Sequence, residues 1–381
     1  MKKRIAFLHI YGPPVIKGGE LSFTEGGLVH ALSASANLTD DYDITIISPN
    51  SSQNGQKQAI NYKGVRIVCL GSSRWWWRWA QLGNLSFFKQ SYKYVRKEKP
   101  DILIANSFLA SSLLPLIPTK ASKIGIIHDL HDSYHTQNMN GSSKPLVRTI
   151  DILERLAIHL TKLNKVGVIN PAVKDALVKG GYPEDKITVV GNGVDIDDYP
   201  FCENKAPCSL IYIGRLAEFK EVSSLVDVAF TIKKEIPNIT LHIVGDGPKY
   251  GEVQKRVEEL KMSSNVIMHG YLTEGEKIDL LTSSTIYVSN SRFEGFGIPL
   301  VEAMATGTVP VVSNIYAHRF VFQDENVGYL VRNNNEMATR IIELLNNEPK
   351  RLQLAKNGRN LVERKWTWAR VGEKYRELLQ L

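Results

Sequence analysis

Two glutamates flank a glycine-rich turn in the second half of the chain. Glu294 and Glu302 stand eight residues apart in residues 291–307, SRFEGFGIPLVEAMATG. The segment follows the apolar run at 285–289, which predicts a strand, a turn and a short helix. The first amides of such a helix have no intrahelical partner, and carboxylates accept strong hydrogen bonds from hydroxyls. The pattern therefore predicts a site for a polyhydroxylated ligand.

Two cations follow the first strand that we predict in the second half. Arg215 and Lys220 come directly after the apolar run at 209–213, in YIGRLAEFK. At the end of a strand, two fixed cations could neutralise the charge of a departing nucleoside diphosphate. In other enzymes a metal ion does this work.

Both segments resemble the retaining GT-B glycosyltransferases of the family 4 (group 1) type, which take sugars from nucleotide donors. The similarity lies in EGFGIPLVEAMATGTVPVV around the two glutamates, and in the Gly-Arg-Leu plus lysine pattern. It implies that Glu294 orients the donor sugar and that Glu302 binds the ribose. It also implies that Arg215 and Lys220 hold the diphosphate, that no metal is needed and that no cofactor is bound besides a UDP- or GDP-sugar as substrate.

One residue departs from the family pattern. Glu221 stands directly after Lys220, where the family commonly has glycine. A carboxylate close to a diphosphate is unfavourable, so we expect that Glu221 either turns outward or occupies part of Lys220.

The resemblance extends to the main chain around the donor. It implies that the turn after Glu294 lies against the ligand, and that the loops VGDGP and HGYL, at the ends of the next two strands, line the base pocket. The donor-binding residues expected from these segments are Gly245, Tyr271, Leu272, Gly295, Phe296, Gly297 and Ile298.

The first half offers fainter signals. Gly18 and Gly19 resemble the family's first glycine loop, whose amides approach the phosphates, although Gly26 and Gly27 form a second pair. We prefer the first pair because the second lies within an apolar helical repeat. His128 ends a predicted strand, where the family often presents a histidine to the transferred sugar, and a histidine there could also assist proton transfer.

Short β-branched runs alternate with helical patterns along both halves, which predicts two doubly wound parallel sheets, an α/β architecture. The resemblance implies a GT-B fold with an N-terminal domain at 1–200, a nucleotide-sugar domain at 205–365 and a last helix, about 366–381, that crosses back. The site would lie in the cleft between the domains. The segment 193–200, followed by 203–207, loses the periodicity and is predicted to be the linker between the domains. Asp195 and Asp197 superficially form an Asp-x-Asp metal motif, but they fall in this linker and we expect no metal there. The predicted strands are 5–10, 43–48, 65–70, 101–106, 123–128, 165–170, 209–213, 240–244, 265–268, 285–289, 309–313 and 328–331, and helices are predicted at 145–162, 224–236, 250–261 and 335–345.

Composition limits the setting in which the protein works. The chain has 381 residues and three cysteines without metal-ligand spacing, which fits a reducing cytoplasm. No run reaches the roughly 18 apolar residues of a membrane span. Residues 1–195 carry 24 Lys and Arg against 15 Asp and Glu, a net +9, and residues 196–381 carry 23 against 24, a net −1, so the basic excess lies in the first half. This half is expected to meet an anionic partner, either a phosphorylated acceptor or the inner face of the cell membrane.

The run RWWWRW at 74–79 has the most unusual composition in the chain. Tryptophan and arginine suit a membrane interface, where a lipid-linked acceptor would also be reached. The same side chains could instead pack under a helix or stack on an acceptor saccharide. Nucleic acid is not expected as a partner, because the rest of the chain does not support it.

Three functions remain open from the sequence. The first is a retaining hexosyltransferase that builds a lipid-linked or cell-surface glycan on an acceptor hydroxyl. The second is a soluble GT-B enzyme that acts on a small acceptor. The third is a partner subunit that binds the donor without turnover.

Overall fold

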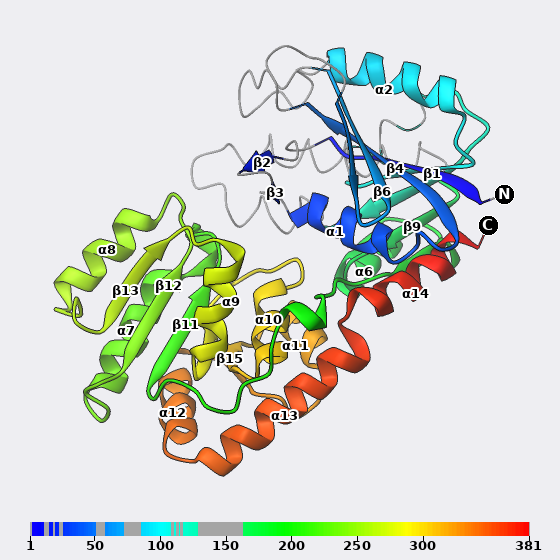
Figure 1. The fold of residues 1–381 in the computed structure, drawn as a ribbon. Coiled ribbons are helices and arrows are strands. Elements are labelled where there is room, and N and C mark those ends of the chain that lie inside the picture. The colour runs from blue at the N-terminus through cyan, green and yellow to red at the C-terminus, as the bar shows by residue number, and fades with distance from the viewer. Residues whose placement is uncertain are drawn as a thin grey trace. The chain divides into compact units, whose positions relative to one another are not determined.

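The computed structural model describes residues 2–10, 15–17, 20–22, 26–50, 58–71, 85–107, 110–111, 114, 117–128 and 163–380 (Figure 1). Several predictions concern residues outside these ranges. They are the loop with Gly18 and Gly19, the tryptophan run and the helix at 145–162.

Residue contacts divide the chain into two units. Unit 1 contains the described residues up to 191 and those from 371 on, and unit 2 contains residues 192–370. The segment predicted as a linker is bonded within unit 2. The Val194 amide donates to the Trp366 carbonyl at 2.9 Å, and the Trp368 amide donates to the Val194 carbonyl at 3.2 Å. The division therefore comes before the predicted linker.

Unit 1 is built on an eight-stranded sheet with the order β10-β9-β8-β7-β1-β4-β6-β5. Only the β5–β6 pairing of this sheet is antiparallel. Lys63 and Gly64 join those two strands, and both have positive φ, 45° and 79°, as a two-residue hairpin turn requires. A short antiparallel hairpin, β2 (Val15–Lys17) with β3 (Glu20–Ser22), lies outside the sheet. The strands of the sheet are β1 (Lys3–Leu8), β4 (Tyr42–Pro49), β5 (Gln58–Tyr62), β6 (Val65–Leu70), β7 (Ile102–Ala105), β8 (Ser122–Ile127), β9 (Lys165–Val168) and β10 (Ile187–Val189).

Four helices of unit 1 are described in full: α1 (Gly26–Ala36), α2 (Leu85–Glu98), α6 (Pro171–Lys179) and α14 (Trp368–Leu379). Asn170 caps α6, since its side chain accepts from the Val173 amide at 3.0 Å. The C-terminal helix belongs to unit 1 from residue 371 on. Its Tyr375 is fully buried, with its ring 6.4 Å from that of Phe7 on β1.

Unit 2 is built on a six-stranded, fully parallel sheet with the order β13-β12-β11-β14-β15-β16. β11 and β14 are buried along their whole length, as expected for strands covered on both faces. The strands are β11 (Ser209–Ile213), β12 (Thr240–Val244), β13 (Val266–Gly270), β14 (Ile286–Ser289), β15 (Val309–Ser313) and β16 (Tyr329–Val331).

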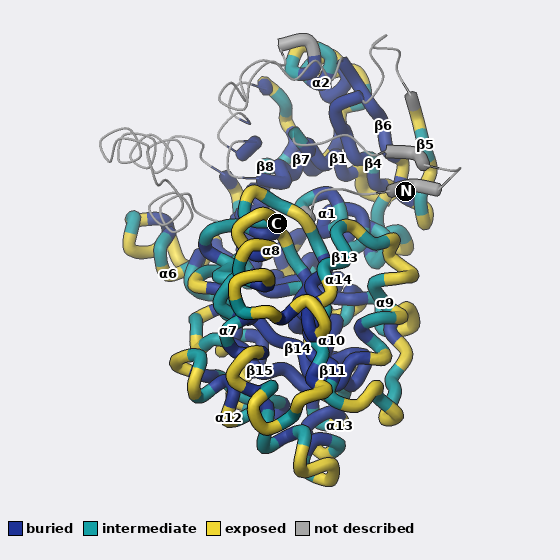
Figure 2. The backbone as a smooth tube through the Cα atoms, turned by 90° about the vertical axis from the view of Figure 1, so that its left-hand side faces the viewer, coloured by how far each residue is buried: buried dark blue, intermediate teal, exposed yellow. Residues whose placement is uncertain are grey.

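Helices cover the sheet of unit 2 and leave their outer faces exposed (Figure 2). Thr273 and Glu276 form a capping box at the start of α9, and Asn333 caps α12. The predicted fold class is confirmed, with β5 as an antiparallel edge strand that the sequence did not indicate. The helices are α7 (Val222–Lys233), α8 (Tyr250–Glu259), α9 (Glu274–Ser283), α10 (Ile298–Thr306), α11 (Tyr316–Phe322), α12 (Asn334–Leu345) and α13 (Glu348–Lys365).

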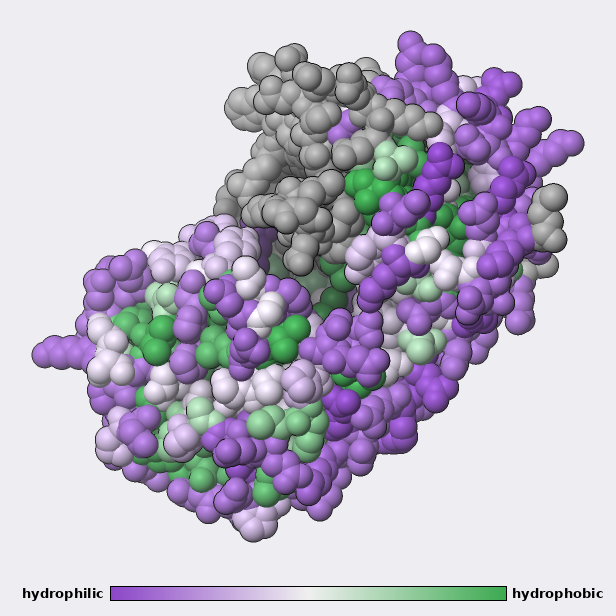
Figure 3. All heavy atoms as spheres, viewed as in Figure 1, coloured by the Kyte–Doolittle hydropathy of each residue, from purple (hydrophilic) through white to green (hydrophobic). Residues whose placement is uncertain are grey.

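Hydrophilic residues dominate the described surface that Figure 3 shows, with apolar patches between them. The exposed large apolar side chains among the described residues are those of Val178, Phe230, Ile267, Tyr271 and Tyr316. None of the helices in the described ranges is long and apolar enough to cross a bilayer.

Candidate active site

A left-handed turn starts the helix that carries the second glutamate. Gly297 has φ 94° and precedes α10 directly, a conformation that favours glycine. Ile298 and Pro299 form the first turn, and no side chain of the described residues caps it. Gly295 and Ile298 are half-buried. The first amides of α10 are thus placed to meet a polar ligand.

Lys220 and Glu294 form an ion pair. Lys220 Nζ lies 2.5 Å from Glu294 Oε1, and both side chains are about 15% exposed. Ser291 donates through Oγ to the same oxygen at 2.8 Å. Lys220 lies in the 3₁₀ turn after β11, so the ends of β11 and β14 meet here. The structure brings together two of the predicted catalytic residues.

The pair holds Glu294 ionised. Burial raises the pKa of Glu294, but the charge of Lys220 and the hydrogen bonds from Lys220 and Ser291 outweigh this effect, so the pKa of Glu294 lies below its usual range. The second oxygen, Oε2, has no bond to a described residue. Glu294 therefore offers one open acceptor.

Glu302 lies inside α10 and is 5% exposed. Its Oε1 accepts from Tyr199 Oη at 2.8 Å and from Lys277 Nζ at 2.9 Å. Burial lowers the pKa of Lys277, but the carboxylates of Glu302 and Glu274 outweigh this effect and raise it. Glu302 Oε2 is buried without a hydrogen-bond partner among the described residues. A buried, unsatisfied acceptor costs about 1–3 kcal/mol, so this oxygen is suited to a ligand hydroxyl.

Glycines let the ends of β11 and β12 approach closely. A Cβ on Gly245, whose φ is 126°, would lie 2.1 Å from the Gly214 carbonyl oxygen. The Gly245 amide donates to the Gly270 carbonyl at 2.7 Å, which brings in the end of β13. Arg215 follows Gly214, is exposed, and its guanidinium is bonded to no described residue. It is a free cation beside the glycine turns.

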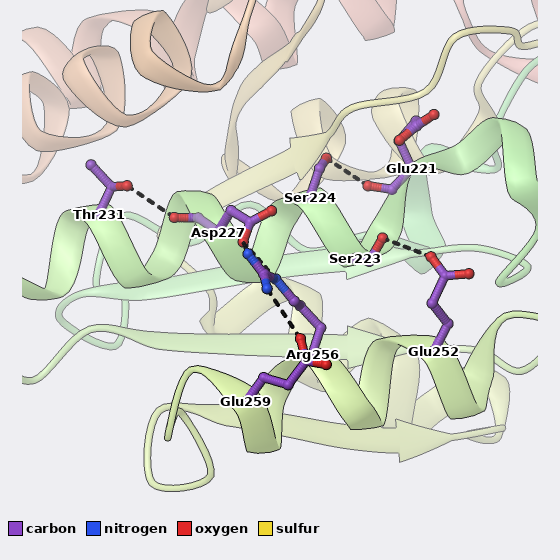
Figure 4. A network of polar contacts seen from close by, with 8 residues as sticks. All are labelled: Glu221, Ser223, Ser224, Asp227, Thr231, Glu252, Arg256 and Glu259. Atoms are coloured by element: carbon purple, nitrogen blue, oxygen red, sulfur yellow. Dashed lines mark hydrogen bonds and ion pairs between the residues drawn. The ribbon is translucent and has the colours of Figure 1, made fainter.

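The carboxylate of Glu221 is directed to Arg292, not to Lys220. Arg292 Nε and Glu221 Oε1 are 2.9 Å apart. Glu221 has φ 50° and ψ 36°, a left-handed conformation in which glycine is free of strain. Its carbonyl accepts from Ser224 Oγ at 2.7 Å, as Figure 4 shows. The backbone explains the glycine that the family has here, and Lys220 is left to Glu294.

Figure 4 also shows how the helix behind Glu221 is fixed to its neighbour. Arg256 on α8 donates to Asp227 on α7 at 2.8 and 2.6 Å, and Ser223 donates to Glu252 at 3.1 Å. Lys249 contacts Glu252 and also Glu218 in the turn before Lys220. These contacts anchor the segment between Arg215 and Lys220, the phosphate loop, which is predicted to hold the diphosphate.

The ring of Phe296 is buried, whereas the loop after β13 exposes the side chain of Tyr271. The Phe296 ring is buried against Trp366 and Phe320, with centroids 5.3 and 6.1 Å away. It can reach a ligand only through its main chain. Tyr271 is 82% exposed and Leu272 is half-buried.

In unit 1, His128 belongs to a polar network around Asn106. Its Nε2 lies 2.9 Å from Asn106 Oδ1, and Asn106 Nδ2 donates to the Gly27 carbonyl at 2.6 Å. The amide orientation is therefore fixed, and His128 carries its hydrogen on Nε2. The ring meets that of His30 edge-on at 4.8 Å, and His30 Nε2 lies 2.8 Å from Tyr375 Oη.

The ring of His128 is held neutral. Burial lowers its pKa well below the ordinary value, and the neighbouring His30 and His9 lower it further. A neutral ring with a fixed tautomer is suited to hydrogen bonding.

Sequence reasoning missed the residues that hold these groups. Tyr199 and Lys277 lie far from Glu302 in the chain, and Asn106 and His318 stand alone in apolar surroundings. Only the strand-end position of Asn106 could have marked it. Among the described residues, no group of three or more His, Cys, Asp or Glu could hold a metal ion.

Two family descriptions match consecutive parts of the chain, Glycosyltransferase Family 4 over residues 24–198 and Glycosyl transferases group 1 over residues 201–361. The chain belongs to the group 1 glycosyltransferases of the family 4 type.

Among its relatives is the poly(ribitol-phosphate) alpha-N-acetylglucosaminyltransferase of Staphylococcus aureus, 26% identical over 75% of this chain and 56% of the relative. The match thus spans little more than half of that relative. Sucrose-phosphate synthase from Thermosynechococcus elongatus has a similar structure, with a TM-score of 0.80, 18% identity and coverage of 99% and 98% of the two chains. S. aureus TarM in complex with fondaparinux, alpha-GlcNAc-glycerol and UDP has a TM-score of 0.71 at 18% identity, with full coverage of both chains. At these identities the two structures show the GT-B fold.

Proposed function

We propose that this glycosyltransferase-family chain moves a hexose from a nucleoside diphosphate sugar to an acceptor hydroxyl, with retention of configuration and without a metal ion. The observation that carries the proposal is Glu302, a buried carboxylate whose Oε2 has no partner among the described residues. Tyr199 and Lys277 fix its other oxygen. A ribose hydroxyl of the donor would supply the missing hydrogen bond.

Two cations serve the diphosphate in this proposal. Arg215 is exposed and its guanidinium is bonded to no described residue, so this cation is available. Lys220 now contacts Glu294, but an ammonium has three donors and can bind a phosphate oxygen as well. Cations positioned at a leaving group replace the work of a metal ion.

The chemical step balances without a protein nucleophile. The acceptor oxygen attacks the anomeric carbon on the face from which the diphosphate leaves. The bond from the anomeric carbon to the phosphate oxygen breaks, and the acceptor proton passes to that oxygen. Glu294 orients the sugar through its open Oε2, and His128 of unit 1 binds a hydroxyl of the sugar or the acceptor.

The acceptor belongs to a lipid-linked or cell-surface glycan in this proposal. Unit 1 contains most of the basic excess, and α2 exposes Lys89, Lys93 and Arg96. The relative in S. aureus is named for poly(ribitol-phosphate), an anionic polymer. The same cations would also support peripheral contact with an anionic membrane.

The test is nucleoside diphosphate release from UDP-, GDP- and ADP-sugars, run with EDTA and repeated with lipid-linked and polyol-phosphate acceptors. Wild type is compared with Glu302→Gln. Glu258→Gln is the matched control, because Glu258 is an exposed residue of α8 in the same unit. We expect one donor to be used, and release to fall in Glu302→Gln but not in the control.

Other results are equally informative. Donor binding without turnover on any acceptor would favour a non-catalytic partner subunit. Turnover that EDTA abolishes would contradict the metal-free step. Neither binding nor release of any nucleotide sugar would overturn the proposal.

A further inference from the structure

His318 is a buried histidine of unit 2 with a fixed ring. It lies on α11 and is 1% exposed. Its Nδ1 is 2.7 Å from the Ser313 carbonyl oxygen, which can only accept, so Nδ1 carries a hydrogen. Burial lowers the pKa of His318. The charge of Glu294 and the hydrogen bond to Ser313 raise it by less, so the pKa lies below its ordinary value. The neutral ring therefore presents a lone pair on Nε2.

The ring edge that carries Nε2 lies beside the turn before α10. An ideal Cβ on Gly297 would lie 3.7 Å from His318 Cδ2 and 4.0 Å from Nε2. Gly297 bears no side chain, so at this point the ring edge meets only main chain. No described residue is bonded to Nε2. An acceptor without a partner among the described residues thus lies beside the turn where the donor is expected.

Serines connect His318 to Glu294. Ser313 accepts from His318 through its carbonyl and donates from Oγ to the Ser291 carbonyl at 2.6 Å. Ser291 in turn donates from Oγ to Glu294 Oε1 at 2.8 Å. The two side chains are therefore held in one rigid arrangement at the ends of β14 and β15.

Both side chains present acceptors and no donor. Glu294 Oε2 and His318 Nε2 are without a bond to any described residue. Two adjacent acceptors suit a ligand with two hydroxyl donors, which a hexose has on neighbouring carbons. A phosphate group would not suit this place, because at neutral pH its oxygens only accept hydrogen bonds and the two protein groups are acceptors as well.

We infer that His318 is a further donor-binding residue, which accepts a hydrogen bond from a hydroxyl of the transferred sugar while Glu294 binds another. This inference rests on the proposed function and adds to it a determinant of sugar specificity. The nucleoside diphosphate part of the donor makes no contact with His318.

Two substitutions of His318 test the roles of its two ring nitrogens separately. His318→Asn keeps a donor near Nδ1 for the Ser313 carbonyl and removes Nε2. His318→Gln instead places an amide oxygen near the position of Nε2. Calorimetry measures the affinity for the nucleoside diphosphate and for the matching nucleotide sugar, and thermal unfolding reports on the fold.

With His318→Asn we expect an unchanged nucleoside diphosphate affinity and about a tenfold loss for the nucleotide sugar, as for one hydrogen bond. His318→Gln should recover part of that loss. One monodeoxy donor should bind wild type and His318→Asn equally, which would identify the hydroxyl.

Equal weakening of both ligands, or no change in either, would overturn the inference and leave the proposed function standing. If wild type binds no nucleotide sugar at all, the proposed function fails and this inference fails with it.

Discussion

The two units present different chemistry at the carboxyl ends of their strands. In unit 2, charges occur in pairs, with Lys220 on Glu294 and Lys277 on Glu302. In unit 1, His128 is neutral and is held by a hydrogen bond with Asn106, while its ring meets that of His30, which is bonded to Tyr375. Both arrangements fix the position of buried polar side chains, but only the first uses ions.

The difference indicates how each unit can respond to a ligand. Under the proposed function, a diphosphate arriving in unit 2 would compete with Glu294 for Lys220, so binding would change the partners of existing charges. In unit 1, the tautomer and orientation of His128 are already fixed, so a ligand would bind there without any change in charge pairing. Charge substitutions should therefore act strongly in unit 2, while pH should reveal the neutral ring in unit 1.

The largest effect is expected for Lys220→Met. The substitution keeps most of the side-chain volume but removes the cation from the proposed diphosphate site and leaves Glu294 without its ion-pair partner. Donor turnover should fall by about 10²–10³-fold, the range found when one electrostatic contact to developing charge is removed. The measurement is the rate of nucleoside diphosphate release under saturating acceptor.

The control for Lys220→Met is Lys255→Met, which removes the same charge from a side chain that is 77% exposed in unit 2. Its rate should match wild type. A comparable loss in both variants would mean that net charge, and not the pair with Glu294, governs turnover.

The neutral ring in unit 1 predicts a smaller, pH-dependent effect for His128→Gln. The folded-state pKa of His128 lies well below 6.5, so below pH 6.5 the unfolded chain binds a proton that the folded chain does not. Wild-type stability should therefore fall as the pH drops from 7.5 to 5.5, with a contribution of about 1.4 kcal/mol from this group. Glutamine does not titrate but can still donate to Asn106, so the variant should lack this contribution. Urea unfolding at both pH values measures the difference.

Histidine-ring ¹⁵N spectra provide an independent check, with His128→Gln assigning the signal. A neutral ring with hydrogen on Nε2 is expected down to pH 5.5. A ring that gains a proton near pH 6.5 in the folded chain would contradict a neutral His128.

The sequence predicted those features that depend on local patterns. The strands at 209–213, 240–244 and 309–313 have the predicted bounds, because each is a short apolar run between turn residues. β5 was missed, since Gln58–Tyr62 is half polar and pairs only on one side. α13 was missed because its long, charged sequence has few apolar positions. The Lys220–Glu294 contact needed the fold to bring two strand ends together.

The role of Glu302 shows the same limit. Its place in a helix could be predicted from the glycine turn and the spacing. Its burial could not, because Tyr199 and Lys277 reach it from a 3₁₀ turn and from α9. His318 gave no local signal, because its significance depends on its hydrogen bond to the Ser313 carbonyl and on the lack of a side chain at Gly297 beside its ring.

The smallest effect is expected at Glu221, where charge and backbone can be separated. Glu221→Gly removes a left-handed non-glycine residue, worth about 1–2 kcal/mol, but it also loses the exposed pair with Arg292 and makes the unfolded chain more flexible. These opposing contributions should leave the free energy of unfolding within about 1 kcal/mol of wild type.

Glu221→Gln is the matched partner, because it removes the charge and keeps the strained backbone. Both variants should bind the nucleoside diphosphate a few-fold more tightly at low salt, since a carboxylate near the phosphate loop is gone. Glu221→Gly should be more stable than Glu221→Gln, because only the glycine variant removes the strained backbone. Affinity is measured by calorimetry at two salt concentrations, and stability by urea unfolding. Unchanged affinity in both variants would show that Arg292 already neutralises Glu221 completely, which would extend the paired-charge arrangement of unit 2 to the one residue that departs from its family.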